Sequence, residues 1–143
     1  KLAFPEIKLG IFPGFAGTIR TPKLIGLVNA LDLILTGKTV DAKKAYKINL
    51  ADAIFDDAQK EFMLEDFVKN AINGNLGSRK DFYLLNYKPF NEIIFKRTLK
   101  NLEDKVNPEF KAPFVALEVI KNTINQKDLE ISKQKQKLNI IMK

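Results

Sequence analysis

One carboxylate and one glycine-rich loop near the start of the chain have the residue types and spacing for acid–base chemistry. Glu6 follows Pro5 and precedes an apolar residue, so its carboxylate is expected to be partly desolvated, which suits general acid–base work. The loop Gly-Phe-Ala-Gly at residues 14–17 offers backbone N–H groups that can hold an anion or a water. Each feature also has a plain structural interpretation, because most glutamates are surface residues and glycines commonly form turns.

Two absences narrow the chemistry that the chain can perform. It has no histidine, the usual general base at neutral pH and a common metal ligand, and no cysteine for disulfides or thiol nucleophiles. Acid–base chemistry must therefore use carboxylates, lysine or tyrosine, and we predict no metal site. Neither a G-x-G-x-x-G fingerprint nor a P-loop occurs, so we predict no NAD site and no other cofactor.

The chain has a formal net charge of +7, which suggests an attraction to anionic ligands. Most basic residues are scattered lysines, and their one concentration is Lys-Gln-Lys-Gln-Lys at residues 133–137. We interpret this charge as a solvated surface and predict no nucleic-acid partner, since no arginine–aromatic pattern accompanies it. The alternative, nucleic-acid binding through the basic tail, predicts steep salt dependence that disappears when residues 132–143 are deleted.

The elements that must position Glu6 and the loop are predicted from hydrophobic periodicity. Apolar residues alternate with polar residues or glycine over residues 7–11, which predicts a short half-buried strand. Pro13 begins a turn after it. Thr18 is the candidate N-cap of a short helix that ends at Gly26.

Two more helices are predicted directly after this first one. Apolar residues recur at helical spacing over residues 27–35, and Gly37 ends that segment. Asp41 is the expected N-cap of a helix over residues 42–48. Asn49 is expected in the left-handed conformation at its end, because asparagine tolerates that conformation better than most residues.

The remaining sequence predicts one more short strand, at residues 50–55, and three further helices, at residues 58–72, 89–102 and 112–124. The fold class is therefore mainly α with one or two short strands. With 143 residues, 45% of them hydrophobic, the chain has the size of about one domain and can bury a core. No apolar run reaches the roughly 18 residues of a membrane-spanning helix, so we predict no transmembrane segment.

The order and spacing of the candidate residues resemble the second acid motif of the crotonase (enoyl-CoA hydratase/isomerase) family. The matching residues are Pro5, Glu6, Lys8, Leu9, Gly10, Pro13, Gly14, Gly17, Thr18 and Arg20. The similarity continues through residues 24–26, 35–38, 41–45 and 50–53. Residues 111–120 resemble the linker after the hydratase part of the multifunctional fatty acid oxidation alpha subunits, so the resemblance is closest to that branch of the family.

The resemblance implies an incomplete crotonase-like spiral fold, of which this chain would be the C-terminal helical portion. Residues 1–73 would be the C-terminal half of the hydratase domain and residues 74–126 a helical linker region. Residues 127–143 would form a polar, basic tail. Ala16 replaces the first of the family's paired glycines, and it would strain the loop if that position needs a positive φ.

The family also implies a mechanism. Two glutamates handle a water that adds across the double bond of a 2-enoyl-CoA, while two backbone N–H groups stabilise the thioester oxyanion. Glu6 matches the glutamate that exchanges a proton at the α-carbon, and Gly14, which follows Pro13, matches a backbone N–H that helps to place the water. The partner glutamate and both oxyanion donors belong to upstream segments of the family that these 143 residues do not contain.

We therefore expect a fragment of a fatty acid β-oxidation enoyl-CoA hydratase that is inactive as an isolated chain. Its implied partners are an acyl-CoA substrate and either a separately encoded N-terminal half or a thiolase beta subunit. The expected compartment is the cytoplasm, with the mitochondrial matrix as the alternative. The alternative function is a non-catalytic helical interaction module, or a degenerate gene remnant, whose apolar faces dock on a partner.

Overall fold

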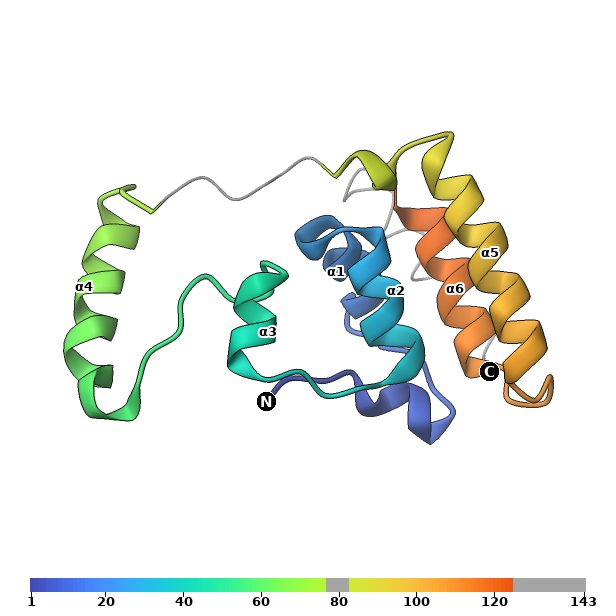
Figure 1. Cartoon of the computed structure of the whole chain (residues 1–143), viewed down its shortest axis with the longest axis horizontal. Helices are drawn as coiled ribbons and strands as arrows, with labels where there is room; N and C mark the ends of the chain where they lie inside the picture. The colour runs from blue at the N-terminus through green and yellow to red at the C-terminus, as the bar shows by residue number, and fades with distance from the viewer. Residues whose placement is uncertain (77–82, 125–143) are drawn as a thin grey trace.

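The computed structural model of the chain describes residues 1–76 and 83–124, and these ranges are mostly helical (Figure 1). This confirms the mainly α fold class. The predicted tail at residues 127–143 lies outside the described residues. The α-helices are α1 (Gly17–Ile25), α2 (Leu27–Thr36), α3 (Ala42–Lys47), α4 (Lys60–Ile72), α5 (Phe90–Lys105) and α6 (Ala112–Thr123). Three short 3₁₀ helices accompany them: η1 (Pro5–Leu9), η2 (Asp57–Gln59) and η3 (Leu84–Asn86).

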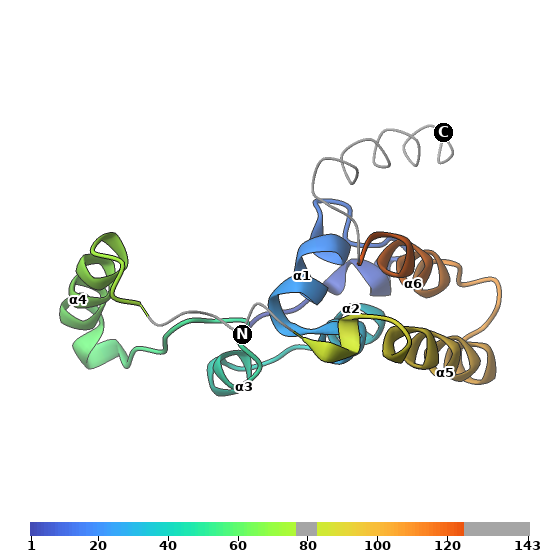
Figure 2. The same cartoon turned by 90° about the horizontal axis from the view of Figure 1, so that it is seen from above.

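Residues 1–50 and 83–124 form a helical body around one hydrophobic core (Figures 1 and 2). Within it α1 packs on α2 and α6, and α6 also packs on α2 and α5. The most completely buried apolar side chains include Ile25, Leu27, Ile34 and Ile120. The core therefore joins helices from both predicted segments, residues 1–73 and 74–126, whose boundary stays a prediction.

The ends of the helices in the body largely follow the sequence signals. Gly26 and Gly37 have φ values of 81° and 58°, and they end α1 and α2 as predicted. The side chain of Asp41 accepts a hydrogen bond from the Lys44 amide at 2.7 Å and caps α3. Asn49 has a φ of 60°, which confirms the left-handed conformation expected there.

Residues 51–76, which we call the arm, leave the body and carry α4 away from it (Figures 1 and 2). No residue of α4 is buried, although the helix matches its predicted position to within two residues. The main local contact is the edge-to-face packing of Phe55 on Phe67, with ring centroids 5.9 Å apart. The arm is thus a helix without a core of its own.

Both predicted strands are wrong. Residues 7–11 do not extend into a strand, because Pro5 begins the 3₁₀ helix η1 and Gly10, with a φ of 79°, ends it. Residues 50–55 contain no strand either. A strand needs a neighbour to satisfy its backbone, and the β-pairing in the described part of the chain is a single bridge between Leu2 and Val40.

Two further details differ from the sequence prediction. Thr18 is not the N-cap of α1, because the helix begins one residue earlier at Gly17 and its N-cap is Ala16. Pro89 is the N-cap of α5 and not its first helical residue. In the ranges 1–76 and 83–124, each helix is too short or too polar to cross a lipid bilayer.

Candidate functional site

Glu6, the predicted catalytic carboxylate, lies in η1, and its side chain is half-buried. Its Oε2 atom is buried and has no hydrogen-bond partner among the residues that the structure describes. A buried polar atom without a partner is costly, and such atoms are rare in folded proteins. This oxygen is therefore the strongest indication of a ligand-directed group in the N-terminal region.

The turn that carries Glu6 is held against the end of α2. Ile7 is 2% exposed and belongs to the core, so it anchors the turn from the residue next to the glutamate. A Cβ at Gly37 would lie 2.8 Å from Ile7 Cγ2 and 3.1 Å from the Phe4 carbonyl oxygen. The close approach of η1 to the end of α2 therefore requires glycine at this position.

The loop that carries Pro13 and Gly14 is tied to the same turn through the Phe4 ring. A Cβ at Gly17, the first residue of α1, would lie 3.0 Å from Phe4 Cε1 and 2.8 Å from Pro13 Cβ. Pro13 itself is buried. The packing of Phe4 and Pro13 on Gly17 thus fixes the start of α1 relative to the turn with Glu6.

Gly14 lies at the exposed edge of this loop. Its backbone N–H donates no hydrogen bond within the described part of the chain, and the neighbouring Phe15 side chain is fully exposed. An amide of an exposed residue near a helix start, without a partner inside the protein, is able to hold a water or an anion. The geometry is compatible with the role predicted for Gly14, which stays a prediction.

Ala16, the residue before helix α1, carries backbone strain. Ala16 has a φ of 67°, in the left-handed region that favours glycine, and it serves as the N-cap of α1 without a side-chain hydrogen bond. Alanine was expected to strain the loop if this position needs a positive φ, and the structure confirms that its φ is positive. The strain lies within the candidate site, two residues after Gly14.

Asn86 holds the junction between α1 and α2, and the sequence analysis did not identify this role. Its buried side chain accepts a hydrogen bond from the Leu27 amide at 2.7 Å and donates one to the Pro22 carbonyl oxygen at 2.9 Å. Its own carbonyl oxygen accepts a hydrogen bond from Asn91 Nδ2 at 2.9 Å. One amide side chain thus bridges the end of α1 and the start of α2.

Tyr83 reinforces the same junction. Its hydroxyl donates a hydrogen bond to the Leu24 carbonyl oxygen at 2.9 Å, and a Cβ at Gly26 would lie 2.8 Å from Cδ1 of its ring. Tyr83 and Asn86 contact residues about 60 positions earlier in the chain. No local pattern could have indicated these contacts, because they depend on how the helices pack.

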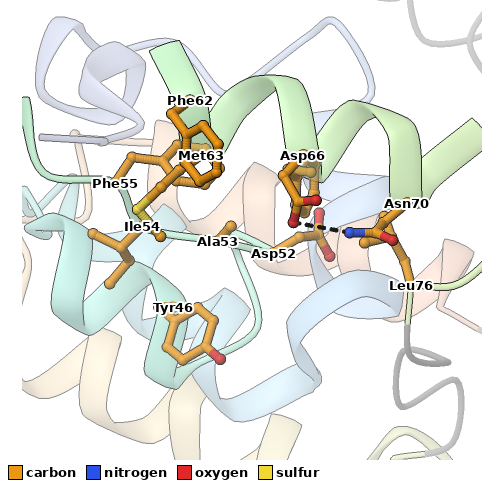
Figure 3. A pocket seen from close by; sticks show the side chains of 11 residues that line it. Tyr46, Asp52, Ala53, Ile54, Phe55, Phe62, Met63, Asp66, Asn70 and Leu76 are labelled. Atoms are coloured by element: carbon orange, nitrogen blue, oxygen red, sulfur yellow. Dashed lines mark hydrogen bonds between the residues drawn. The ribbon is translucent and has the colours of Figure 1, made fainter. Parts of the chain in front are cut away.

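Two surface grooves lie away from the candidate residues, and Glu6, Pro13 and Gly14 line neither of them. The arm groove, of about 500 Å³, lies between α4 and the segment before it. Figure 3 shows Phe62 and Met63 of α4 close to Phe55 in this groove. The α5–α6 groove, of about 640 Å³, lies on the helical body.

The rim of the α5–α6 groove carries charges of both signs, from Glu92, Lys96, Glu118 and Lys121. Lys88 Nζ lies 2.9 Å from Glu92 Oε1, and this hydrogen bond, with the charge of Lys88, holds the pKa of Glu92 below its ordinary value. The charges of Lys96 and Lys121 lower the pKa of Glu92 further. Both lysines line the groove together with Glu92.

Comparison with known proteins agrees with the motif around Glu6. Residues 1–140 match the family model described as Enoyl-CoA hydratase/isomerase. The chain therefore belongs to the enoyl-CoA hydratase/isomerase family.

Curated relatives are named fatty acid oxidation complex subunit alpha. The protein from Psychrobacter sp. (strain PRwf-1) is 37% identical over 134 residues, and the match covers 87% of this chain. Those from Vibrio parahaemolyticus and Vibrio cholerae are 34% and 38% identical, over 88% and 84% of this chain. In each case the match spans only 18% of the relative's length.

Proposed function

We propose that this chain supplies one of the two glutamates of a 2-enoyl-CoA hydratase site that acts in fatty acid β-oxidation. The family membership and the names of the relatives support this role. The observation that carries the proposal is the buried, unpaired Oε2 atom of Glu6, which lies in the segment that resembles the family's acid motif. The substrate is a coenzyme A thioester and no cofactor takes part.

In the proposed reaction a water adds across the C2–C3 double bond of the enoyl thioester. A water O–H bond breaks, the hydroxyl oxygen bonds to C3, and a proton bonds to C2, which gives the 3-hydroxyacyl-CoA. Glu6 exchanges the proton at C2. The Gly14 amide helps to hold the water, and buried Pro13 shapes the loop that presents this amide.

The 143 residues alone are proposed to lack hydratase activity. The reaction builds negative charge on the thioester oxygen, and a single oxyanion donor is commonly worth about 3–4 kcal/mol. In the family these donors and the second glutamate come from upstream segments. The proposed partner is a polypeptide that carries this N-terminal half, and the proposed location is the cytoplasm.

A crotonyl-CoA assay tests the proposal through the loss of enoyl absorbance. We expect no turnover by the chain alone, and turnover when it is co-expressed with the upstream hydratase segment of the Psychrobacter relative. Glu6→Gln should then lower kcat by at least about 100-fold, the usual contribution of a positioned acid–base group.

Glu109→Gln is the matched control, because this exposed glutamate lies outside the candidate site and its loss should leave kcat unchanged. Robust turnover by the isolated chain would show that the half-site proposal is wrong. An active complex that tolerates Glu6→Gln would remove Glu6 from the mechanism.

A second candidate function is a non-catalytic interaction module, and the exposure of α4 favours it. Phe62 and Ile72 are 79% and 80% exposed, which is unusual for large apolar side chains on one short helix. A thiolase beta subunit remains a proposed partner on the fatty acid oxidation interpretation. Binding to that subunit in a pull-down, without hydratase activity in any complex, would support this second function.

A further inference from the structure

Helix α4 ends in a left-handed glycine turn. Asn73 is the C-cap residue, and Gly74 follows it with a φ of 70°. The Asn75 amide donates a hydrogen bond to the Asn70 carbonyl oxygen at 2.9 Å, and the Gly74 amide donates one to the Ala71 carbonyl oxygen at 3.2 Å. These two bonds form a Schellman motif, in which glycine adopts the positive φ without a steric cost.

The glycine that ends the helix also makes Asn73 reactive. The Cγ atom of an asparagine can be attacked by the backbone nitrogen of the next residue, which closes a five-membered ring. A side chain on that next residue hinders the attack, and glycine has none. Asn73-Gly74 is the one Asn-Gly pair in the sequence, so Asn73 has the least hindered attacking nitrogen of all the asparagines.

The surroundings of this pair leave room for the attack. Both residues are exposed, and a Cβ at Gly74 would meet no heavy atom within 4 Å in the described part of the chain. No residue of α4 is buried, so tertiary packing does not hold the end of the helix. The hydrogen bond from Gly74 to Ala71 must break for the attack, and hydrogen bonds at exposed helix ends open at little cost.

We propose that Asn73 is a site of spontaneous deamidation, with water as the co-reactant. The Gly74 nitrogen loses its proton to hydroxide and attacks Asn73 Cγ. A new C–N bond forms, the C–N bond of the side-chain amide breaks, and ammonia leaves with a proton from water, which regenerates hydroxide. Water then opens the succinimide ring at one of its two carbonyl carbons, which gives aspartate or isoaspartate.

Both products change the end of α4. Each adds a negative charge at the C-terminus of the helix, where the macrodipole is already negative. Isoaspartate also adds a carbon atom to the main chain before Gly74, so the Gly74 and Asn75 amides lose the geometry of their present hydrogen bonds. We therefore expect the last turn of α4 to open while the helical body stays unchanged. This inference goes beyond the hydratase proposal and depends on no part of it.

Peptide mapping of the full chain during incubation at mildly alkaline pH tests the proposal. Trypsin cuts after Lys69 and Arg79, so one fragment carries Asn70, Asn73 and Asn75, and mass spectrometry assigns the product to one of them. We expect aspartyl and isoaspartyl forms at Asn73 to accumulate at least about tenfold faster than at Asn75, which precedes a leucine. The rate should rise with pH, because the attacking nitrogen must lose its proton.

Two variants of the glycine separate its lack of a side chain from its role in the turn. Gly74→Ala should slow the reaction at Asn73 by at least about tenfold, because a Cβ hinders the attack. Gly74→Asn should slow it as much, although asparagine tolerates the left-handed conformation better than alanine. Asn75→Gln is the matched control in the same turn and should leave the rate at Asn73 unchanged.

Two further measurements test the structural part of the proposal. A synthetic peptide of residues 70–79 gives the rate without a helix, and the full chain should react within about tenfold of it, since helix ends open with free energies near zero. Hydrogen exchange of the deamidated chain should be faster at the Gly74 and Asn75 amides and unchanged at the Ile34 amide of the body.

Four results would overturn the proposal. Asn73 could stay intact while Asn75 deamidates, or the full chain could react more slowly than the tenfold limit, which would mean that the turn protects Asn73. The rate could be the same in both Gly74 variants as in the unchanged chain. Unchanged hydrogen exchange at Gly74 and Asn75 after deamidation would remove the effect on α4. None of these results involves catalysis, so the hydratase proposal is tested separately by its own assay.

Discussion

The helical body and the arm use the same kinds of side chain with opposite results. In the body, Ile34 and Ile120 are fully buried between helices that come from distant parts of the chain. In the arm, Ile72 is 80% exposed although it occupies an equally regular helix. The difference shows that an amphipathic helix is stabilised by the surface it meets, and that its own periodicity does not supply that surface.

The largest expected effect is on the free energy of unfolding, and it distinguishes the helical body from the arm. Ile120→Ala should lower the free energy of unfolding by about 2–5 kcal/mol, because it removes most of a fully buried side chain and leaves a cavity in the core. Ile72→Ala makes the same chemical change on the arm and should cost less than about 0.5 kcal/mol. Urea unfolding followed by circular dichroism measures both, and equal costs would contradict the division into body and arm.

The next effect compares two asparagines with different surroundings. Asn86→Ala should cost about 1–3 kcal/mol, since it leaves the Leu27 amide without its partner and removes one of the two hydrogen bonds to the Pro22 carbonyl oxygen. Asn70→Ala removes only an exposed hydrogen bond to Asp66 on the arm. Its cost should stay within about 0.5 kcal/mol in the same unfolding experiment.

A smaller effect concerns the strained position beside the candidate site. Ala16→Gly should raise the free energy of unfolding by about 0.5–1 kcal/mol, because glycine adopts a φ of 67° without a steric cost. Ala45→Gly, inside α3 and fully buried, should have the opposite sign. Two changes of the same sign would show that Ala16 carries no strain.

The smallest effect is a titration on the surface of the body. Lys88 holds the pKa of Glu92 below its ordinary value, so Lys88→Met should raise it toward that value. A lowered folded-state pKa contributes stability above the unfolded-state pKa, and this contribution is lost as the pH falls through the folded-state pKa. Carboxyl NMR titration of Glu92 measures the shift, and added salt should reduce it.

The helix ends were predictable because their causes are local. Gly26, Gly37 and the Asp41 cap act within one turn of the chain, and Asn49 adopts the conformation that its side chain tolerates. The strands at residues 7–11 and 50–55 were not predictable in the same way. A strand depends on a neighbouring strand, and Pro5 together with Gly10 closes a 3₁₀ turn without one.

The candidate site was likewise predictable only where its features are local in the sequence. Glu6, Pro13 and Gly14 were selected from residue types and spacing, and the structure adds that one oxygen of Glu6 is buried without a partner. The contribution of Asn86 and Tyr83 was not visible in the sequence. Their hydrogen bonds join residues about 60 positions apart, and only the packing of the helices brings them together.

By itself the sequence determined the family, the helical character of the chain and most helix boundaries, since these depend on motifs and on contacts within a few residues. Tertiary structure alone decided which apolar faces are buried and which are left exposed on α4. The physical reason is that burial is a property of two surfaces, and the second surface is encoded far away in the chain or on another molecule.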